Sequence, residues 1–183
     1  MRWLTQSYET VLKFWFQEID SAMWFAKDDA FDKEIKRRFE KTYLQAIKGE
    51  LYLWRENLLG RLAEIIVLDQ FPRNMYRNSA KAFQADSLAL ILSQEAITIP
   101  EFSQLTSSQQ RFTLMPWMHS ESLGIHKQAE KLFEQYHLDK ALKYERQHKE
   151  IIERFGRYPH RNVVLKRQST PEEKKFLRDF QGF

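Results

Sequence analysis

Apolar side chains recur every three or four positions along this chain, a spacing that places them on one face of an α-helix. The longest stripe consists of Phe31, Ile35, Phe39, Tyr43 and Ile47. It predicts an amphipathic helix that begins at an Asp28 or Asp29 cap and ends at Gly49. The only β-leaning run, residues 163–165, is too short to indicate a strand, so we expect an all-α fold.

Few residues interrupt these expected helices. The 183 residues include five glycines and five prolines, less than half of the usual share of about 12%. The glycines lie too far apart for a phosphate-binding loop or a nucleophile elbow, which need them within about six positions. The absence of cysteine excludes disulfides, thiolate metal sites and cysteine nucleophiles. Histidines and acids show no spacing typical of metal ligands, so we predict neither a metal site nor a cofactor.

Capping residues and prolines indicate where the later helices begin and end. Residues 98–108 are expected to form a loop. A short helix is expected to end near Pro116, and Ser120 is expected to cap the next one. Gly156 is typical of the residue that follows a helix, and Thr170 opens a capping box for the last helix. These signals predict an array of about eight helices in antiparallel pairs.

The charge is distributed unevenly. Between Lys140 and Arg178 there are 12 Lys and Arg against five Asp and Glu, whereas the remainder holds 17 against 20. We interpret this excess of basic residues as a solvent-exposed helix face rather than as a surface that binds nucleic acid. Residues 1–6 lack the apolar run of a signal peptide, and no uncharged stretch approaches the ~20 residues of a membrane span. We expect one cytoplasmic domain over residues 1–183, without a membrane segment.

Two carboxylates occur on apolar helix faces. Asp69 and Asp86 each share a face with apolar residues three or four positions away. A carboxylate that faces a core destabilises the fold unless it is paired. Arg73 and Arg77 are candidate partners close in sequence, and Asn74 adds another hydrogen-bonding side chain. These five residues predict either a structural network at a corner between two helices or the polar floor of a ligand pocket.

A second cluster follows Pro116 and consists of His119, Ser120 and Glu121. Glu121 suits the first turn of a helix as an acid, whereas no capping role requires His119. His119 and Glu121 are therefore candidate catalytic residues, and a buried, hydrogen-bonded packing histidine is the alternative. Their H-x-E spacing also occurs in zinc deaminases, but without cysteine the other zinc ligands are missing.

A third cluster surrounds a proline turn after a helix and consists of His148, Arg157, His160, Arg161 and Asn162. Two arginines and a histidine on a rigid turn suit a carboxylate or phosphate ligand. The same arginines equally suit the two buried carboxylates of the first cluster. If either arginine pairs with those carboxylates, the three clusters form a single site, in which His160 is a further catalytic candidate.

Taken together and in this order, the clusters resemble a bacterial family of uncharacterised proteins, the domain-of-unknown-function family nine-twenty-four. The resemblance covers nearly the whole chain, and its motifs are Val11–Phe16, Gly60–Ala63, Leu68–Asn74, Arg77, Phe83, Asp86, Pro116, His119–Glu121, His148, Phe155–Asn162, Arg167, Ser169–Glu173 and Phe176–Leu177. Tyr158, Lys166 and Ser122 depart from the family pattern, which usually has phenylalanine, glycine and an acid there. The resemblance implies an antiparallel helical array that forms a tetratricopeptide-repeat-like right-handed superhelix, and it implies no established activity.

Three functions remain open from the residues. The first is a binding module that holds a small polar or anionic ligand, or a peptide, in a pocket lined by arginine, histidine and aspartate. The second is a hydrolase or lyase with His119 or His160 as general acid or base, oriented by a carboxylate and with arginines as substrate anchors. The third is nucleic-acid binding through the basic C-terminal quarter. The oligomeric state stays open.

Overall fold

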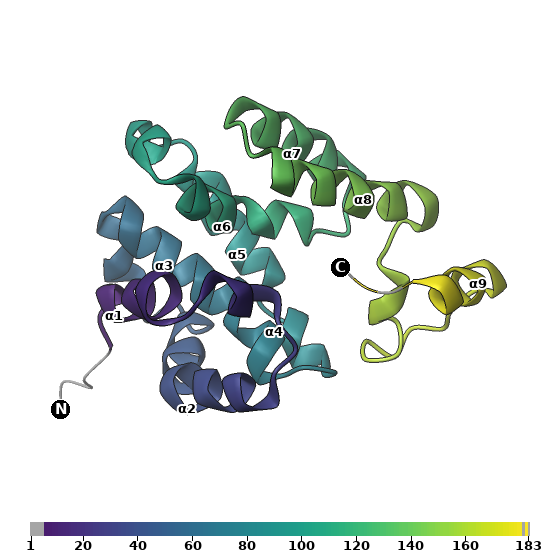
Figure 1. Cartoon of the computed structure of the whole chain (residues 1–183), viewed down its shortest axis with the longest axis horizontal. Coiled ribbons are helices and arrows are strands. Elements are labelled where there is room, and N and C mark those ends of the chain that lie inside the picture. The colour runs from purple at the N-terminus through teal and green to yellow at the C-terminus, as the bar shows by residue number, and fades with distance from the viewer. Residues whose placement is uncertain (1–5, 181, 183) are drawn as a thin grey trace.

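The structure, a computed structural model, describes residues 6–180 and 182. Every regular element of these residues is helical and no strand occurs among them, which confirms the predicted all-α fold (Figure 1). Residues 1–5, on which the signal-peptide prediction largely depends, lie outside the described part. The α-helices are α1 (Tyr8–Lys13), α2 (Asp29–Ala46), α3 (Leu58–Asp69), α4 (Phe71–Met75), α5 (Asp86–Ala96), α6 (Ser107–Met118), α7 (Leu123–Gln135), α8 (Asp139–Phe155) and α9 (Pro171–Asp179).

Short 3₁₀ helices connect several of these elements, and a π-helical turn, Phe14–Glu18, extends α1. The 3₁₀ helices are Ser21–Phe25, Tyr52–Glu56, Ala80–Phe83, Pro100–Gln104 and Pro159–Arg161.

Several predicted helix boundaries are confirmed by their capping contacts. The Asp28 side chain accepts a hydrogen bond from the Phe31 backbone NH at 2.8 Å, which caps α2. Thr170 and Glu173 exchange the reciprocal bonds of a capping box at the start of α9. Gly156 follows α8 with a φ of 68°, the left-handed conformation that glycine adopts without strain.

α3 forms the centre of the main core. Its residues are buried on nearly all sides, and α1, α2, α5 and α6 pack around it (Figure 1). Aromatic rings fill the space between them, with the Phe71 centroid 4.7 Å from Phe39 and 5.6 Å from Trp15. Full burial of one such side chain stabilises the fold by about 1.5–3 kcal/mol. This packing holds the C-terminal end of α3, and with it Asp69, in a fixed position.

The C-terminal half adds a helical hairpin and a separate short helix. α7 and α8 pack side by side and are joined only by residues 136–138 (Figure 1). A second core beneath them includes Phe102, Phe133 and Leu142. After α8 the chain passes through Pro159–Arg161 and reaches α9, which packs on this turn at the edge of the molecule (Figure 1).

The helix predicted to end near Pro116 continues through the proline and ends two residues later, at Met118. Proline removes one hydrogen bond from the helix interior. The segment from Phe112 to Met118 is buried, and this packing offsets the lost bond. Residues 98–108 are likewise not simply a loop, since they contain a 3₁₀ helix and the start of α6.

Ser120 does not cap α7 as predicted. Ser122 occupies the position before the helix and makes no side-chain capping bond. The Ser120 hydroxyl instead accepts a hydrogen bond from the Ser122 backbone NH at 3.2 Å. The chain between α6 and α7 is thus a turn held by its own side chain, and α7 begins two residues later than the sequence indicates.

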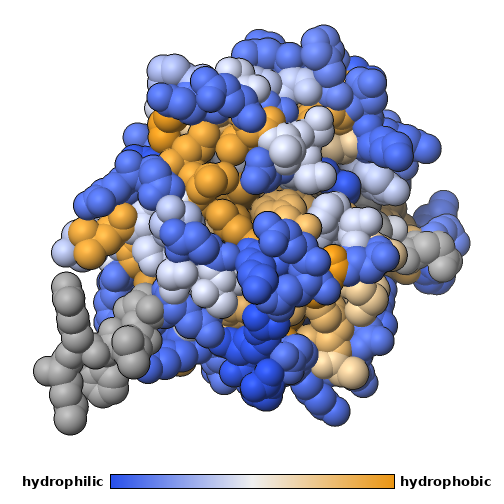
Figure 2. Space-filling view, turned by 60° about the vertical axis from the view of Figure 1, so that its left-hand side comes forward, coloured by the Kyte–Doolittle hydropathy of each residue, from blue (hydrophilic) through white to orange (hydrophobic). Residues whose placement is uncertain are grey.

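The face of the molecule seen in Figure 2 is largely hydrophilic. Figure 2, which brings forward the left-hand side of Figure 1, shows one area where hydrophobic side chains gather among hydrophilic ones. Within the described part of the chain, every helix falls short of the length and apolarity that crossing a bilayer requires.

Candidate functional site

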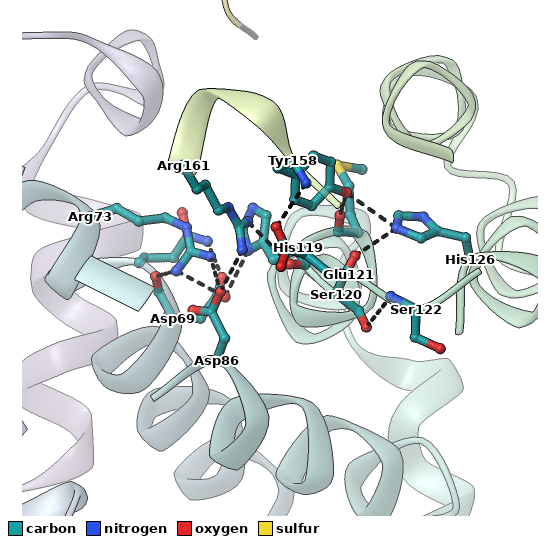
Figure 3. A network of polar contacts seen from close by, with 12 residues as sticks. Asp69, Arg73, Asp86, His119, Ser120, Glu121, Ser122, His126, Tyr158 and Arg161 are labelled. Atoms are coloured by element: carbon teal, nitrogen blue, oxygen red, sulfur yellow. Dashed lines mark hydrogen bonds and ion pairs between the residues drawn. The ribbon is translucent and has the colours of Figure 1, made fainter. Parts of the chain in front are cut away.

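Residues from all three predicted clusters meet where several helical segments end. Asp69 ends α3, Arg73 lies in α4, Asp86 begins α5, His119 follows α6, and Arg161 ends the 3₁₀ helix after α8. Figure 3 shows their side chains directed towards one another. The three clusters were expected to form a single site if Arg157 or Arg161 paired with a buried carboxylate. Arg161 makes this pairing, because its Nη1 lies 3.3 Å from Asp86 Oδ2.

Asp69 is completely buried and its carboxylate is fully paired. Oδ1 lies 2.7 Å from His119 Nδ1 and 3.3 Å from Arg73 Nη1, and Oδ2 accepts a hydrogen bond from the Gln70 amide. Burial raises the pKa of this carboxyl, but the charge of Arg73, the interaction with His119 and the hydrogen bond from Gln70 outweigh burial and lower the pKa to about 2. Asp69 is therefore an anion at neutral pH.

His119 is nearly buried and has two different nitrogens. Because anionic Asp69 is an acceptor, Nδ1 carries the proton and donates it, and Nε2 is left with a lone pair. No side chain or carbonyl of the described residues bonds Nε2. Burial, followed by the charge of Arg73, lowers the pKa of His119 below its usual 6.5. The imidazole is thus neutral at neutral pH, with Nε2 as an unused acceptor.

Asp86 bridges two arginines. Its Oδ2 lies 3.0 Å from Arg73 Nη2 as well as near Arg161, whereas Oδ1 is buried without a hydrogen-bond partner among the described residues. The Arg161 guanidinium lies between the rings of Phe83 and Tyr158, 4.5 Å from each centroid. Two aromatic faces hold the guanidinium plane in place. Two carboxylates and two arginines give this network no net charge.

A pocket of about 280 Å³ opens between α5, the end of α6 and the turn after α8. Its polar lining consists of Gln84, Asp86, Ser87, His119, Ser120, Glu121 and Arg161. Its apolar lining includes Phe83, Leu90, Pro116 and Leu165. Asp69 and Arg73 do not line this pocket, and they position His119 and Asp86 from outside it.

Glu121 lines the pocket, but both of its carboxylate oxygens are engaged. Arg167 donates to them at 2.6 and 2.9 Å, and the Tyr158 backbone NH donates at 2.7 Å. Burial raises the pKa of Glu121, and these hydrogen bonds outweigh burial and lower it. Glu121 thus ties the turn before α7 to the turn after α8.

A buried pair near the pocket was not identified from the sequence. His126 Nδ1 lies 2.6 Å from Glu145 Oε1, and His126 Nε2 lies 2.8 Å from the Ser120 carbonyl (Figure 3 shows His126). A carbonyl only accepts, so Nε2 carries a proton, and a second proton lies between Nδ1 and the carboxyl. Burial raises the pKa of Glu145. The two residues lie on α7 and α8, and no local spacing relates them.

Besides Asp69 and Arg73, six predicted ligand-binding residues do not line this pocket: Asn74, Arg77, His148, Arg157, His160 and Asn162. Asn74 and Arg77 both bind Asp32 of α2, at 2.8 and 2.7 Å, so they join α4 to α2. Packing of α2 on α4 supplies this acid, which is remote in sequence.

The residues of the third cluster other than Arg161 have structural contacts of their own. Arg157 and Asn162 both contact Glu173, which joins the turn to α9. His148 is buried, donates from Nδ1 to the Tyr144 carbonyl at 2.8 Å, and has its pKa lowered to about 2 by burial. His160 is exposed, and its ring stacks on Phe180 with centroids 5.4 Å apart.

Among the described residues, histidines and acidic side chains do not gather in any group of three or more that could hold a metal ion.

Comparison with known proteins places the chain among uncharacterised bacterial proteins. The sequence model of DUF924, a bacterial protein of unknown function, matches residues 11–180. A solved structure of the protein of unknown function ATU0120 from Agrobacterium tumefaciens is 33% identical, with a TM-score of 0.87 over 94% of this chain and 97% of that chain. No curated protein matches.

Proposed function

Because the chain belongs to the DUF924 family of bacterial proteins of unknown function, we propose its function from the pocket alone: it binds a small polar molecule that donates hydrogen bonds. The observation that carries this proposal is that two side chains of the pocket lining each keep an unused acceptor, Nε2 of His119 and the buried Oδ1 of Asp86. A buried acceptor without a partner is destabilising, and a ligand hydroxyl or amine relieves that penalty on binding.

The charge balance favours a polar ligand over an anionic one. Arg73 and Arg161 are already neutralised by Asp69 and Asp86, so an anion has to compete with carboxylates that the fold holds in place. Arg161 then forms a rigid part of the pocket lining. It holds Asp86 in position rather than attracting the ligand by its charge.

The test is ligand-observed NMR with a panel of neutral hydroxyl compounds, such as monosaccharides and nucleosides, and a parallel panel of small carboxylates. Ser87 is exposed at the pocket, so Ser87→Phe blocks the opening without touching the buried network. Leu88→Phe, next along α5 and outside the pocket lining, is the matched control.

We expect a neutral compound to bind the unmodified chain and the Leu88→Phe chain with similar affinity, and the Ser87→Phe chain at least about tenfold more weakly. Binding that survives Ser87→Phe, or no binding by any neutral compound at about 10 mM, contradicts the proposal.

A hydrolase or lyase is the second candidate, and the free Nε2 of His119 favours it. A neutral imidazole held by a carboxylate at 2.7 Å has the arrangement of a general base. The test is turnover of chromogenic esters, phosphoesters and glycosides. Removal of a general base lowers a rate by about 100-fold or more, so His119→Gln is expected to abolish any activity found. Activity equal in His119→Gln and the unmodified chain excludes this role.

A further inference from the structure

We propose that a second pocket, on the other side of α6, binds a small amphiphilic anion: a carboxylate or phosphate on a short apolar body, with its charged group on Arg111. This pocket has a volume of about 190 Å³ and lies between α6, α8 and the 3₁₀ helix Ser21–Phe25. Of its lining residues, only His119 also lines the first pocket.

Arg111 is a cation that no ion pair within the described part of the chain neutralises. Asp139 lines a neighbouring pocket together with it but forms no ion pair with it. The Arg111 guanidinium lies 4.6 Å from the centroid of the Phe25 ring, and no acidic side chain of the described residues pairs with it. Arg73 and Arg157, by contrast, each pair with a carboxylate within 3.0 Å. Burial lowers the pKa of Arg111, which agrees with a partly desolvated cation. An anionic ligand supplies the missing counter-charge.

The other residues that line the second pocket suit the apolar part of such a ligand. Met115, Met118 and Phe25 provide apolar walls, and methionine side chains adapt to the shape of a ligand. Tyr144 and His148 complete the lining on the α8 side. Within the part of the chain that the structure describes, no Asp or Glu lines this pocket, whereas Asp86 and Glu121 line the first one. The two pockets thus differ in charge, and the second is the one that suits an anion.

The two methionines allow a test that reports on this pocket directly. Methyl-labelled methionine is observed by NMR while sodium benzoate, phenyl phosphate or benzyl alcohol is added. Benzoate and phenyl phosphate distinguish a carboxylate from a phosphate group, and benzyl alcohol is the uncharged match. We expect at least one anion to shift the Met115 and Met118 resonances saturably, at least about tenfold more tightly than benzyl alcohol.

Arg111→Met keeps the apolar stem and removes the charge, and it is expected to weaken anion binding by at least about tenfold. Arg111→Lys keeps the charge and retains a weaker preference for the anion. Arg146→Met removes an exposed α8 arginine that pairs with Glu130, and this matched control leaves anion binding unchanged. The amide spectrum of each variant verifies that it is folded.

Three outcomes overturn the proposal: benzyl alcohol binds as tightly as the anions, Arg111→Met binds them unchanged, or neither anion shifts Met115 and Met118 at about 10 mM. The result is independent of the first pocket, because Ser87→Phe blocks only that pocket and is expected to leave anion binding unaltered.

Discussion

His119 Nδ1 and Asp69 Oδ1 lie 2.7 Å apart although the two residues are 50 positions apart in the chain. The contact joins the C-terminal ends of α3 and α6, two helices that pack together in the main core. It sets the tautomer of His119 and therefore leaves Nε2 as the acceptor. The same bond thus connects the stability of the core to the chemistry of the pocket.

Replacement of Asp69 by asparagine is expected to destabilise the protein strongly. Asp69→Asn leaves the charge of Arg73 with only Asp86 to balance it in a buried setting, and breaking a buried pair in this way costs about 3–5 kcal/mol. Urea unfolding near pH 7 measures the change. Asp179→Asn, at an exposed position, is the control and shifts the free energy of unfolding by at most about 0.5 kcal/mol. A loss below about 1 kcal/mol for Asp69→Asn contradicts the buried-pair interpretation.

The stabilisation from Asp69 is also expected to disappear in acid. Its pKa is about 2 in the folded chain against 3.8 for the free group, so the unfolded chain binds the proton more readily. The contribution is present above about pH 4 and is lost as the pH falls through about 2, and it amounts to about 2 kcal/mol. The free energies of unfolding of the unmodified and Asp69→Asn chains should therefore converge over this range. If the difference between the two free energies of unfolding stays constant over this range, packing rather than charge accounts for the stabilisation by Asp69.

His148 is expected to make the protein less stable in mild acid. Burial lowers its pKa from 6.5 to about 2, so below pH 6.5 the unfolded chain gains a proton that the folded chain does not. Stability then falls with decreasing pH by up to about 1.4 kcal/mol per pH unit. His148→Gln should reduce this slope between about pH 6 and 5, whereas His137→Asn, at an exposed position, should not. Equal slopes for both variants exclude His148 as the source.

The polar network is recognisable from the sequence where local spacing determines it. Asp69 and Arg73 are one helical turn apart, and a carboxylate on an apolar face requires a partner, so their pairing follows from the pattern. The pairing of Asp86 with Arg161 was one of two possibilities, because the turn offers Arg157 as well. The structure assigns Arg157 to Glu173 through the packing of α9, which no local spacing indicates.

Features that depend on helix packing were not accessible from the sequence. Arg111 lies in α6, and its lack of an ion-pair partner among the described residues becomes apparent only when α8 and Phe25 are placed beside it. Asn74 and Arg77 were expected to line the polar floor of a ligand pocket or to form a structural network with Asp69 and Asp86. The packing of α2 instead places Asp32 against both of them. In each case the decisive partner comes from a distant segment.

Lys166 is strained, and glycine is expected to relieve the strain. Its φ of 55° lies in the left-handed region, where a side chain is unfavourable by about 1–2 kcal/mol. Lys166→Gly should raise the free energy of unfolding by about 0.5–1 kcal/mol, since the greater freedom of glycine in the unfolded chain offsets part of the gain. Gly156→Ala, at a φ of 68°, is the reverse control and should lower stability. Thermal unfolding measures both, and a loss of stability in Lys166→Gly contradicts the strain.

Gly60 is expected to tolerate no side chain, because the backbone of α3 at this residue lies in close contact with the backbone of Trp54. A Cβ atom at Gly60 would lie 1.9 Å from the Trp54 carbonyl oxygen and 2.8 Å from its carbon. Relief requires movement of backbone rather than of a flexible side chain, so Gly60→Ala should lower the free energy of unfolding by about 1–3 kcal/mol or more. Gly124→Ala is the matched control, since its Cβ meets only the Ser122 hydroxyl at 3.7 Å. Alanine is the better helix former by up to about 1 kcal/mol, so that change should stabilise α7. If both variants raise the free energy of unfolding, helix propensity rather than the contact with Trp54 governs position 60.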